Sequence, residues 1–508
     1  MDWSTYVTPP LRREARFGDR VVPLFTERPA SIWAMVEQAA ARNGDGEALV
    51  CGTVRLSWRE VVETAARIAG GLHARGLRPG DRLAVLLGNR IEFVLTLFAA
   101  AKLGLITVLL STRQQTPEIA YVLKDCGATL LLHEAALADR LPAAAETPEL
   151  AGRIAVDDHP PRSGFAVLAD HAAHEARVEV AEEDTAMILY TSGTTGRPKG
   201  AMLAHGNIVH SSMIYEACLG LTPADRSIAA VPLGHVTGVV ANVTSMARCA
   251  GTLIIMPEFK AGEYLKLAAR ERVTYTVMVP AMYNLCLLQR DFDSHDLSSW
   301  RIGGFGGVAG LTDYLEANEV DLLIDATHPF ANRISANAAE AAKISGTPVF
   351  ALTRPGWVRQ AYDRWISVGS VEAAVIALGE TPRRVFLVMD GEGRELPRGE
   401  IGEIWIGGGQ VIKGYWNNPM ATAESFTAGY WHSGDLGSVD ADNFVRVFDR
   451  QKDMINRGGL KIYSAEVESV LASHPLVVES AIIARPCPVL GERVHAVVVT
   501  RGPAQLVR

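Results

Sequence analysis

Short apolar runs alternate with amphipathic stretches in the first part of the chain, and this alternation restricts the possible fold most. Apolar runs typical of strands occur at residues 82–87, 106–110 and 129–132. Helical periodicity occurs at residues 57–72, 91–103 and 117–126. Strands that alternate with helices in this way are typical of a mainly parallel sheet covered by helices. We therefore predict an α/β fold.

A glycine- and hydroxyl-rich stretch, YTSGTTGRPKG at residues 190–200, follows a predicted strand at residues 186–189 and precedes a predicted helix at residues 207–215. Its glycines allow the backbone to approach a ligand closely, and its hydroxyls, amides and lysine suit a polyphosphate. Neither the P-loop spacing nor a strand-GxGxxG-helix pattern is present. A flexible surface loop is the alternative, but the eleven residues together favour phosphate binding. The candidate binding residues are Thr191, Ser192, Gly193, Thr194, Thr195, Gly196 and Lys199.

The stretch resembles the phosphate-binding motif of the adenylate-forming superfamily, which includes acyl-CoA synthetases, luciferases and peptide-synthetase adenylation domains. Residues 231–238, VPLGHVTG, resemble the next motif of that superfamily, with Gly234 in place of the usual aromatic residue. The resemblance implies that Lys199 and His235 are catalytic residues and that His235 lies by the acyl pocket. A structural role for His235 is the alternative. It further implies an enzyme that activates a carboxylic acid with ATP and Mg²⁺, and passes the acyl group to coenzyme A.

Later motifs of the same superfamily follow in order. Residues 430–436 resemble the motif whose aspartate, here Asp435, binds the ribose hydroxyls, and a carboxylate is a natural acceptor for a vicinal diol. Residues 449–455 resemble the hinge before a small C-terminal domain, which implies a ribose or phosphate contact for Arg450 and the hinge position for Lys452. A turn residue and a solvated charge are the alternatives for Asp435 and Arg450. The late PxTxxGK segment with its lysine is missing, so we expect a lid domain cut roughly in half.

The middle of the chain departs from this pattern. Residues 307–388 contain no aromatic-Gly-x-Thr-Glu motif, which in the superfamily stacks on adenine and contributes to phosphate and Mg²⁺ binding. Instead, DATHPFA at residues 325–331, RPGW at 354–357 and RRVFL at 383–387 resemble the NADPH-dependent precorrin-6A reductases of cobalamin biosynthesis. The glycine-rich strand-loop-helix that opens their nucleotide site is absent. We therefore favour Asp325 as a strand-end carboxylate and His328 as a helix-start residue, both without a substrate.

These resemblances predict a mosaic chain: a large N-terminal adenylate-forming-type domain with a Rossmann-like foreign segment, and a truncated small α+β lid. The expected boundaries are 1–302 for the first AMP-binding region, 303–387 for the reductase-like segment, 388–449 for the resumed AMP-binding region and 450–508 for the lid. The expected function is that of an acid–CoA ligase with impaired or no turnover. The alternatives are an NADPH-dependent precorrin-6A reductase and a non-catalytic nucleotide-binding mosaic.

Composition excludes several other classes of protein. The net charge of −8 gives no indication of nucleic-acid binding. The six cysteines are scattered without a CxxC pair, which argues against a disulfide framework or a zinc site and suits the cytoplasm. The most apolar segment, residues 93–110, contains Lys102 and Gly104 and is interpreted as a buried helix and strand, not a membrane span. We expect a small carboxylic acid as substrate and assign no metal-ligating residue.

Overall fold

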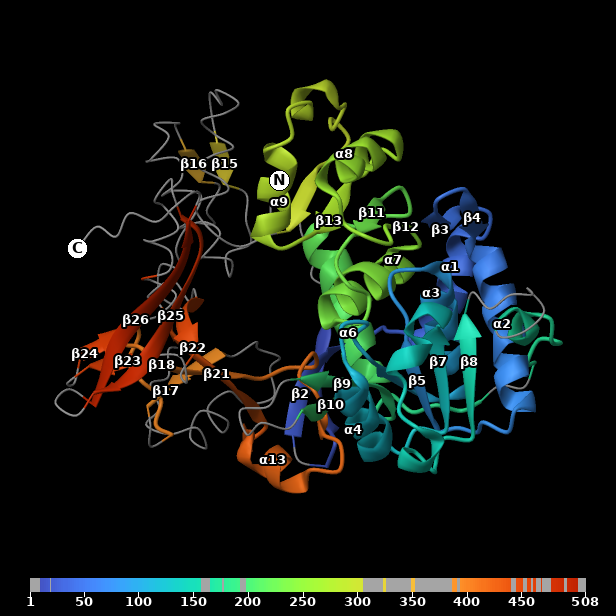
Figure 1. Cartoon of the computed structure of the whole chain (residues 1–508), viewed down its shortest axis with the longest axis horizontal. Coiled ribbons are helices and arrows are strands. Elements are labelled where there is room, and N and C mark those ends of the chain that lie inside the picture. The colour runs from blue at the N-terminus through green and yellow to red at the C-terminus, as the bar shows by residue number, and fades with distance from the viewer. Residues whose placement is uncertain are drawn as a thin grey trace. The chain divides into compact units, whose positions relative to one another are not determined.

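The computed structural model consists of two compact units (Figure 1). The large unit comprises Thr5–Phe305 and Gly409–Ser425, and the small unit comprises Met1–Ser4, Gly306–Gly408 and Phe426–Arg508. The structure describes residues 10–18, 20–156, 165–175, 178–191, 198–304, 323–325, 349–351, 386–390, 393–439, 445–450, 455–457, 460–462, 467, 477–487 and 491–500.

A seven-stranded sheet carries the predicted phosphate-binding stretch in the large unit. In spatial order its strands are β19 (Gly414–Tyr415), β10 (Lys199–Ala204), β9 (Thr185–Thr191), β6 (Ile106–Leu109), β5 (Arg82–Leu86), β7 (Leu130–Glu134) and β8 (Gly152–Val156). The strands from β9 to β8 are parallel, as predicted. The pairings of β10 with β9 and of β19 with β10 are antiparallel. The sequence analysis did not predict these two strands.

A second sheet of six strands completes the framework of the large unit. Its order is β14 (Ile302–Gly304), β13 (Tyr275–Val277), β11 (Arg226–Ala229), β12 (Thr252–Ile255), β3 (Glu47–Cys51) and β4 (Val54–Ser57). All described pairings in it are parallel except that of β3 with β4. The α/β fold predicted from the sequence is therefore confirmed.

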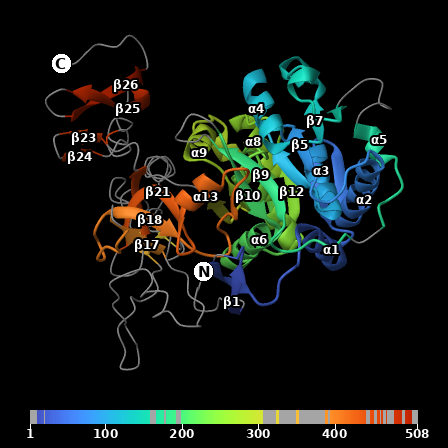
Figure 2. The same ribbon diagram turned by 90° about the horizontal axis from the view of Figure 1, so that it is seen from below.

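The helices of the large unit form where the sequence provides caps and apolar faces. α2 (Trp58–Ala74) begins with the capping box of Ser57 and Glu60. α3 (Ile91–Leu103) is apolar all round, with ten of its thirteen residues buried, as expected for a helix enclosed by other elements. It packs beside α2 in a core that includes residues of both sheets (Figure 2). The remaining helices are α1 (Ile32–Asn43), α4 (Thr116–Cys126), α5 (Phe165–Ala169), α6 (His205–Leu219), α7 (Ser245–Cys249), α8 (Ala261–Arg270), α9 (Pro280–Leu287) and α13 (Pro419–Glu424).

No helix among the described residues is both long and apolar enough to cross a membrane. Short 3₁₀ helices occur at Ala135–Arg140, Ala144–Glu146 and Phe292–Ser294. A π-helix, Thr237–Thr244, precedes α7.

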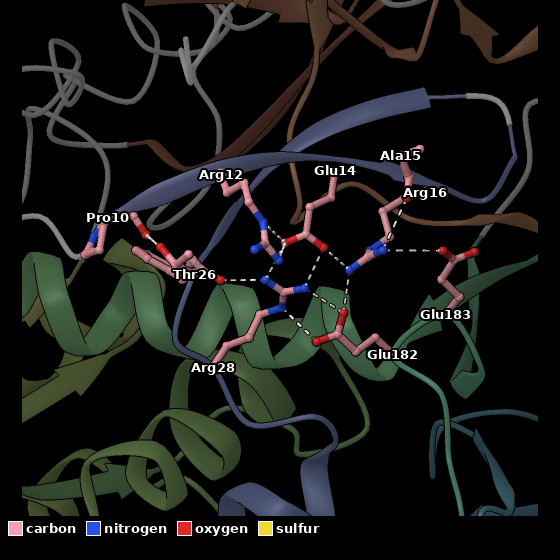
Figure 3. Close-up of polar contacts among 10 residues, drawn as sticks. Pro10, Arg12, Glu14, Ala15, Arg16, Thr26, Arg28, Glu182 and Glu183 are labelled. Carbon is pink, nitrogen blue, oxygen red and sulfur yellow. Dashed lines mark hydrogen bonds and ion pairs between the residues drawn. The ribbon is translucent and has the colours of Figure 1, made fainter. Parts of the chain in front are cut away.

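Within the large unit, an N-terminal hairpin of β1 (Leu11–Arg16) and β2 (Arg20–Phe25) is attached to the rest of the unit by a network of charged side chains (Figure 3). Arg28 lies between two carboxylates, at 2.8 Å from Glu14 and 2.7 Å from Glu182. Arg16 contacts Glu182 at 2.6 Å. Hydrogen bonding to Arg28 lowers the pKa of Glu14 to about 2. The network thus fixes the hairpin to the segment that leads into β9.

Residues 409–413, which belong to the large unit, are held against its N-terminal part by two buried polar side chains. Asn207 donates to the carbonyls of Gly409 and Val411 at 2.8 and 2.9 Å. Arg20 donates to the carbonyls of Ile412 and Lys413 at 3.0 and 3.1 Å. These contacts bring β19 to the edge of the seven-stranded sheet, although it lies more than two hundred residues after β10 in the sequence.

The small unit contains three groups of strands among its described residues. One sheet has the order β17 (Phe386–Met389), β18 (Gly402–Ile406), β21 (Tyr430–Val439) and β20 (Phe426–Thr427), with β22 (Val445–Arg450) also paired to β21. A four-stranded sheet has the order β24 (Leu460–Ile462), β23 (Ile455–Arg457), β26 (Gly491–Thr500) and β25 (Val477–Cys487).

The third group is a parallel pair, β15 (Leu323–Asp325) and β16 (Val349–Ala351). Asp325 is the last residue of its strand, as the sequence analysis expected. The helix expected after Pro329, together with His328, lies outside the described residues.

Candidate functional site

The predicted phosphate-binding stretch joins the two strands of a hairpin. Thr191, the last residue of β9, is the cross-strand partner of Lys199, the first residue of β10. Residues 192–197 connect them and lie outside the described residues, so Ser192, Gly193, Thr194, Thr195 and Gly196 are placed only by these flanking positions. The structure therefore brings Thr191 and Lys199 together at the base of the predicted loop.

The ammonium group of Lys199 lies over an aromatic ring. Its Nζ atom is 5.5 Å from the ring centre of Tyr415, which belongs to β19. Tyr415 reaches this position because it is the cross-strand partner of Ala201 in β10. Among the described residues, no carboxylate forms an ion pair with Lys199. A partly exposed ammonium that rests on a ring and is not neutralised by a described carboxylate fits an anionic group such as phosphate.

His235 lies at the end of a turn fixed by a buried asparagine. Asn89 donates to the carbonyls of Ala229 and Val231 at 3.3 and 3.0 Å, and it accepts from the Leu233 amide at 2.8 Å. The His235 side chain itself is exposed. The sequence analysis missed Asn89, because a single asparagine between a strand and a helix carries no distinctive pattern.

Gly238 is required by the close packing of the same turn. A Cβ atom at this position would lie 2.3 Å from the Pro232 carbonyl oxygen and 2.7 Å from the Leu233 Cα atom. At Gly238, which follows the exposed residues His235 and Val236, the backbone therefore packs directly against Pro232 and Leu233. The π-helix that begins at Thr237 continues from this contact.

Asp435 and Arg450, the two residues expected near ribose, are cross-strand partners in the small unit. The Asp435 amide donates to the Ser433 hydroxyl at 3.0 Å. The preceding Gly434 has a φ of 69°, which favours glycine, and its amide donates to Glu403 at 3.1 Å. Lys452, the expected hinge residue, lies outside the described residues.

No group of three or more His, Cys, Asp or Glu side chains capable of holding a metal ion occurs in the part of the chain that the structure describes.

Comparison with known proteins supports two families. Residues 36–318 match the AMP-binding enzyme family, and residues 466–508 match the AMP-binding enzyme C-terminal domain. Residues 265–393 match the precorrin-6x reductase CbiJ/CobK family, which confirms the predicted mosaic.

Among individual proteins, the chain is 36% identical to a feruloyl-CoA synthase of Amycolatopsis sp over 454 residues, which cover 88% of this chain and 84% of that protein. It is 32% identical to the long-chain-fatty-acid–CoA ligase FadD13 of Mycobacterium tuberculosis over 453 residues, 88% of this chain and 83% of that protein. The crystal structure of ATP-bound MatB from Rhodopseudomonas palustris matches with a TM-score of 0.74 and 28% identity, covering 94% of this chain and 90% of that one.

The match to the AMP-binding enzyme family includes the predicted phosphate-binding stretch at residues 190–200. The alignments with the two acid–CoA ligases each cover 88% of this chain. The chain belongs to the AMP-binding (adenylate-forming) enzyme family and carries a segment similar to precorrin-6x reductase in its middle.

Proposed function

We propose that the chain is an ATP-dependent carboxylic acid–CoA ligase in which nucleotide binding persists and turnover is impaired or absent. The observation that carries the proposal is the placement of Lys199 at the base of the predicted phosphate loop, over Tyr415 and without a described carboxylate partner. The reaction class follows from the family assignment. The ammonium group of Lys199 is the proposed cation for the phosphates of ATP.

The proposed roles follow the family motifs. Thr191, Lys199 and residues 192–196 bind the phosphates of ATP, and Lys199 acts on the reacting phosphate. Asp435 binds the ribose hydroxyls, and Arg450 contacts ribose or phosphate. His235 lies by the acyl substrate, and Lys452 is the hinge before the C-terminal domain. Coenzyme A is the acyl acceptor. We assign no residue to Mg²⁺, because residues 307–388 lack the aromatic-Gly-x-Thr-Glu motif whose glutamate binds it in the family.

In the proposed reaction a carboxylate oxygen of the acid attacks the α-phosphate in line, and pyrophosphate leaves. Positive charge and loop amides stabilise the transition state of such a transfer. Residues 307–388 lack the aromatic-Gly-x-Thr-Glu motif that would contribute to adenine and phosphate binding. Loss of one preorganised electrostatic group typically costs about 10²–10³ in rate. We therefore expect weak ATP binding and turnover close to background.

An apolar acid is the proposed substrate class. Residues 231–240 contain no Lys, Arg, Asp or Glu, and Val236 beside His235 is 51% exposed. Such a segment offers no charged partner to a second carboxylate. The named relatives include enzymes for feruloyl-CoA and for long-chain fatty acids, which agrees with an aryl or fatty acid.

The test measures ATP binding by calorimetry and pyrophosphate release with a panel of aryl and fatty acids plus coenzyme A. The parent should bind ATP, and Lys199→Ala should weaken binding. Lys266→Ala is the matched control, because Lys266 is exposed on α8 and contacts only Glu263, at 3.1 Å, among the ion pairs of the described residues. Equal ATP affinity of the parent and Lys199→Ala would refute the assigned phosphate site.

Replacement of residues 305–387 by the corresponding segment of MatB tests the cause of the low turnover. If the missing motif is responsible, the exchanged chain should release pyrophosphate at least about 10²-fold faster than the parent. Turnover by the parent of about 1–10³ s⁻¹, abolished by Lys199→Ala, would instead show that impaired turnover is wrong.

The reductase alternative is separated by NADPH binding. Only the match over residues 265–393 and the parallel β15–β16 pair favour it. NADPH should not raise the thermal unfolding midpoint, whereas ATP should. Saturable NADPH binding that is lost in His328→Ala would favour the reductase.

A further inference from the structure

Helix α4 contacts both ends of the predicted phosphate loop. The hydroxyl of Tyr121 donates to the carbonyl of Pro198, the residue before β10, at 3.1 Å. The carboxylate of Asp125, one turn further along α4, accepts from the hydroxyl of Tyr190 at 2.5 Å. Tyr190 lies near the end of β9. One helix thus contacts the chain on each side of residues 192–197.

The two contacts support each other through the aromatic rings. The rings of Tyr121 and Tyr190 meet edge to face with their centres 6.4 Å apart. Both rings are partly buried against the apolar cluster that contains Ile119, Val122 and Ile188. Since the rings are held by packing, the direction in which each hydroxyl points is restricted. The hydrogen bond from Tyr121 therefore fixes the Pro198 carbonyl, and the hydrogen bond to Asp125 fixes the side chain of Tyr190.

The same helix also contacts the segment that carries Tyr415. The side-chain amide of Asn417 donates to the backbone carbonyl of Asp125 at 3.0 Å. The backbone amide of Trp416 donates to the Gly200 carbonyl at 2.8 Å. The ring beneath Lys199 is thereby fixed to the same support as the two ends of the loop.

The Tyr190 hydroxyl remains a donor over the whole physiological pH range. Burial, together with the hydrogen bond to the Asp125 carboxylate, raises the pKa of Tyr190 well above its ordinary value. Only the protonated phenol donates to a carboxylate. The Tyr190 hydroxyl consequently stays protonated under ordinary assay conditions.

We propose that Tyr121 and Asp125 are positioning residues that hold Pro198 and Tyr190, the residues on either side of the predicted phosphate loop, where they favour binding of a triphosphate. The inference rests on the proposed ATP site. A loop whose ends are already fixed loses less conformational freedom when the ligand binds, so more of the interaction energy appears as affinity. Neither residue is assigned a contact with the nucleotide.

The test compares Tyr121→Phe and Asp125→Ala with the parent, with ATP and inorganic tripolyphosphate as ligands. Each change removes one hydrogen bond, and each should weaken binding of both ligands about 3- to 10-fold. Asp125→Asn should bind nearly as tightly as the parent, because the amide oxygen still accepts from Tyr190. Tyr264→Phe is the matched control, because its buried hydroxyl donates to Thr276 at 3.1 Å in the other sheet.

Two further measurements separate positioning from a general structural role. In the Lys199→Ala background, Tyr121→Phe should change the affinity by less than about 2-fold, because the effect acts through the phosphate site. Tyr190→Phe removes the donor of the same hydrogen bond that Asp125→Ala removes on the acceptor side. The double variant should therefore lose no more triphosphate affinity than either single variant. Thermal unfolding midpoints of the variants should match that of Tyr264→Phe.

The outcomes are distinguishable. Unchanged triphosphate affinity in folded Tyr121→Phe and Asp125→Ala would overturn the inference and leave the proposed function intact. The same follows if each effect persists undiminished in the Lys199→Ala background. If the parent binds neither ATP nor tripolyphosphate, the proposed function fails, and the inference fails with it.

Discussion

Asp435 and Arg450 are cross-strand partners in the antiparallel ladder between β21 and β22. The sequence analysis assigned Asp435 to the ribose hydroxyls and Arg450 to ribose or phosphate, from two separate motifs. The backbones of these two residues lie directly opposite each other in the ladder. An acceptor for the ribose hydroxyls and a cation for an adjacent phosphate are compatible with this arrangement.

Asp435→Ala, which removes the acceptor proposed for the ribose hydroxyls, should weaken ATP binding selectively. A hydrogen bond to a charged group contributes about 1.5–3 kcal/mol, so the dissociation constant for ATP should rise roughly 10- to 100-fold. Inorganic tripolyphosphate lacks ribose, and its affinity should not change. Titration calorimetry with both ligands checks the prediction, and an equal loss for both would exclude a ribose contact.

Tyr415 should contribute to phosphate binding through its ring. Tyr415→Phe keeps a ring beneath Lys199, whereas Tyr415→Leu removes it. Cation–π contacts contribute about 0.5–1 kcal/mol at exposed sites, so Tyr415→Leu should weaken ATP binding about 2- to 5-fold relative to Tyr415→Phe. Equal affinities of the two variants would show that the ring is dispensable. Both should be compared by calorimetry at one ionic strength, because salt screens the phosphate interaction.

His205 should make the stability of the large unit sensitive to acid between pH 6.5 and about 4. The residue is 1% exposed at the start of α6, and burial lowers its pKa from 6.5 to about 4. The unfolded chain binds a proton below pH 6.5, whereas the folded chain does so only near pH 4. This contribution is therefore complete above pH 6.5 and is lost as the pH falls through that interval.

Urea unfolding at several pH values tests this prediction. The slope of unfolding free energy against pH should be smaller in His205→Gln, by up to about 1.4 kcal/mol per pH unit between the two pKa values. The glutamine side chain retains an acceptor for the Ile32 amide, which donates to His205 at 3.4 Å. Parallel slopes for the parent and the variant would contradict the assignment.

Arg301 should be essential to the stability of the six-stranded sheet next to the middle segment. Its guanidinium contacts Asp225 at 2.8 Å, and the Asp225 side chain is 4% exposed. Burial alone would raise the pKa of Asp225, but hydrogen bonds from Thr274 and Arg301 outweigh it and lower the pKa. Removal of one partner leaves a buried charge.

Arg301→Ala should reduce the unfolding free energy by about 3–5 kcal/mol. Arg272→Ala is the control, because Arg272 is 66% exposed and lies 3.7 Å from an exposed Asp296. That surface pair should contribute at most about 1 kcal/mol. Chemical denaturation measures both, and a small effect of Arg301→Ala would show that the hydrogen bonds from Thr274 and Thr222 suffice to hold Asp225.

Local signals predicted the helices and parallel strands well. The helical periodicity of residues 57–72 coincides with α2, and that of residues 91–103 coincides with α3. β10 was missed because its six residues, KGAMLA, lack a strong alternation and are stabilised by β9 and β19 on either side. The N-terminal hairpin was missed because its attachment depends on Glu182, which is distant in the sequence.

The candidate site shows the same limit. Residue types predicted Thr191 and Lys199 as phosphate-binding residues. The structure places Thr191 at the end of β9 and Lys199 opposite it, at the start of β10. Tyr415 and Asn89 gave no signal as site residues, because their roles arise from pairing and hydrogen bonds across distant segments. The functions of Asp435, Arg450 and Lys452 stay predictions.

The late position of β19 in the sequence affects how the protein is made on the ribosome. β10 is synthesised long before its outer neighbour, since about 210 residues separate Ala204 from Gly414. At about 5–20 residues per second, the nascent chain waits about 10–40 s for β19. During that interval Asn207 and Arg20 lack the carbonyls of residues 409–413, and the β10 edge is open to chaperones or to other nascent chains. The time needed to translate residues 205–413 therefore sets when β19 can pair with β10 and complete the seven-stranded sheet.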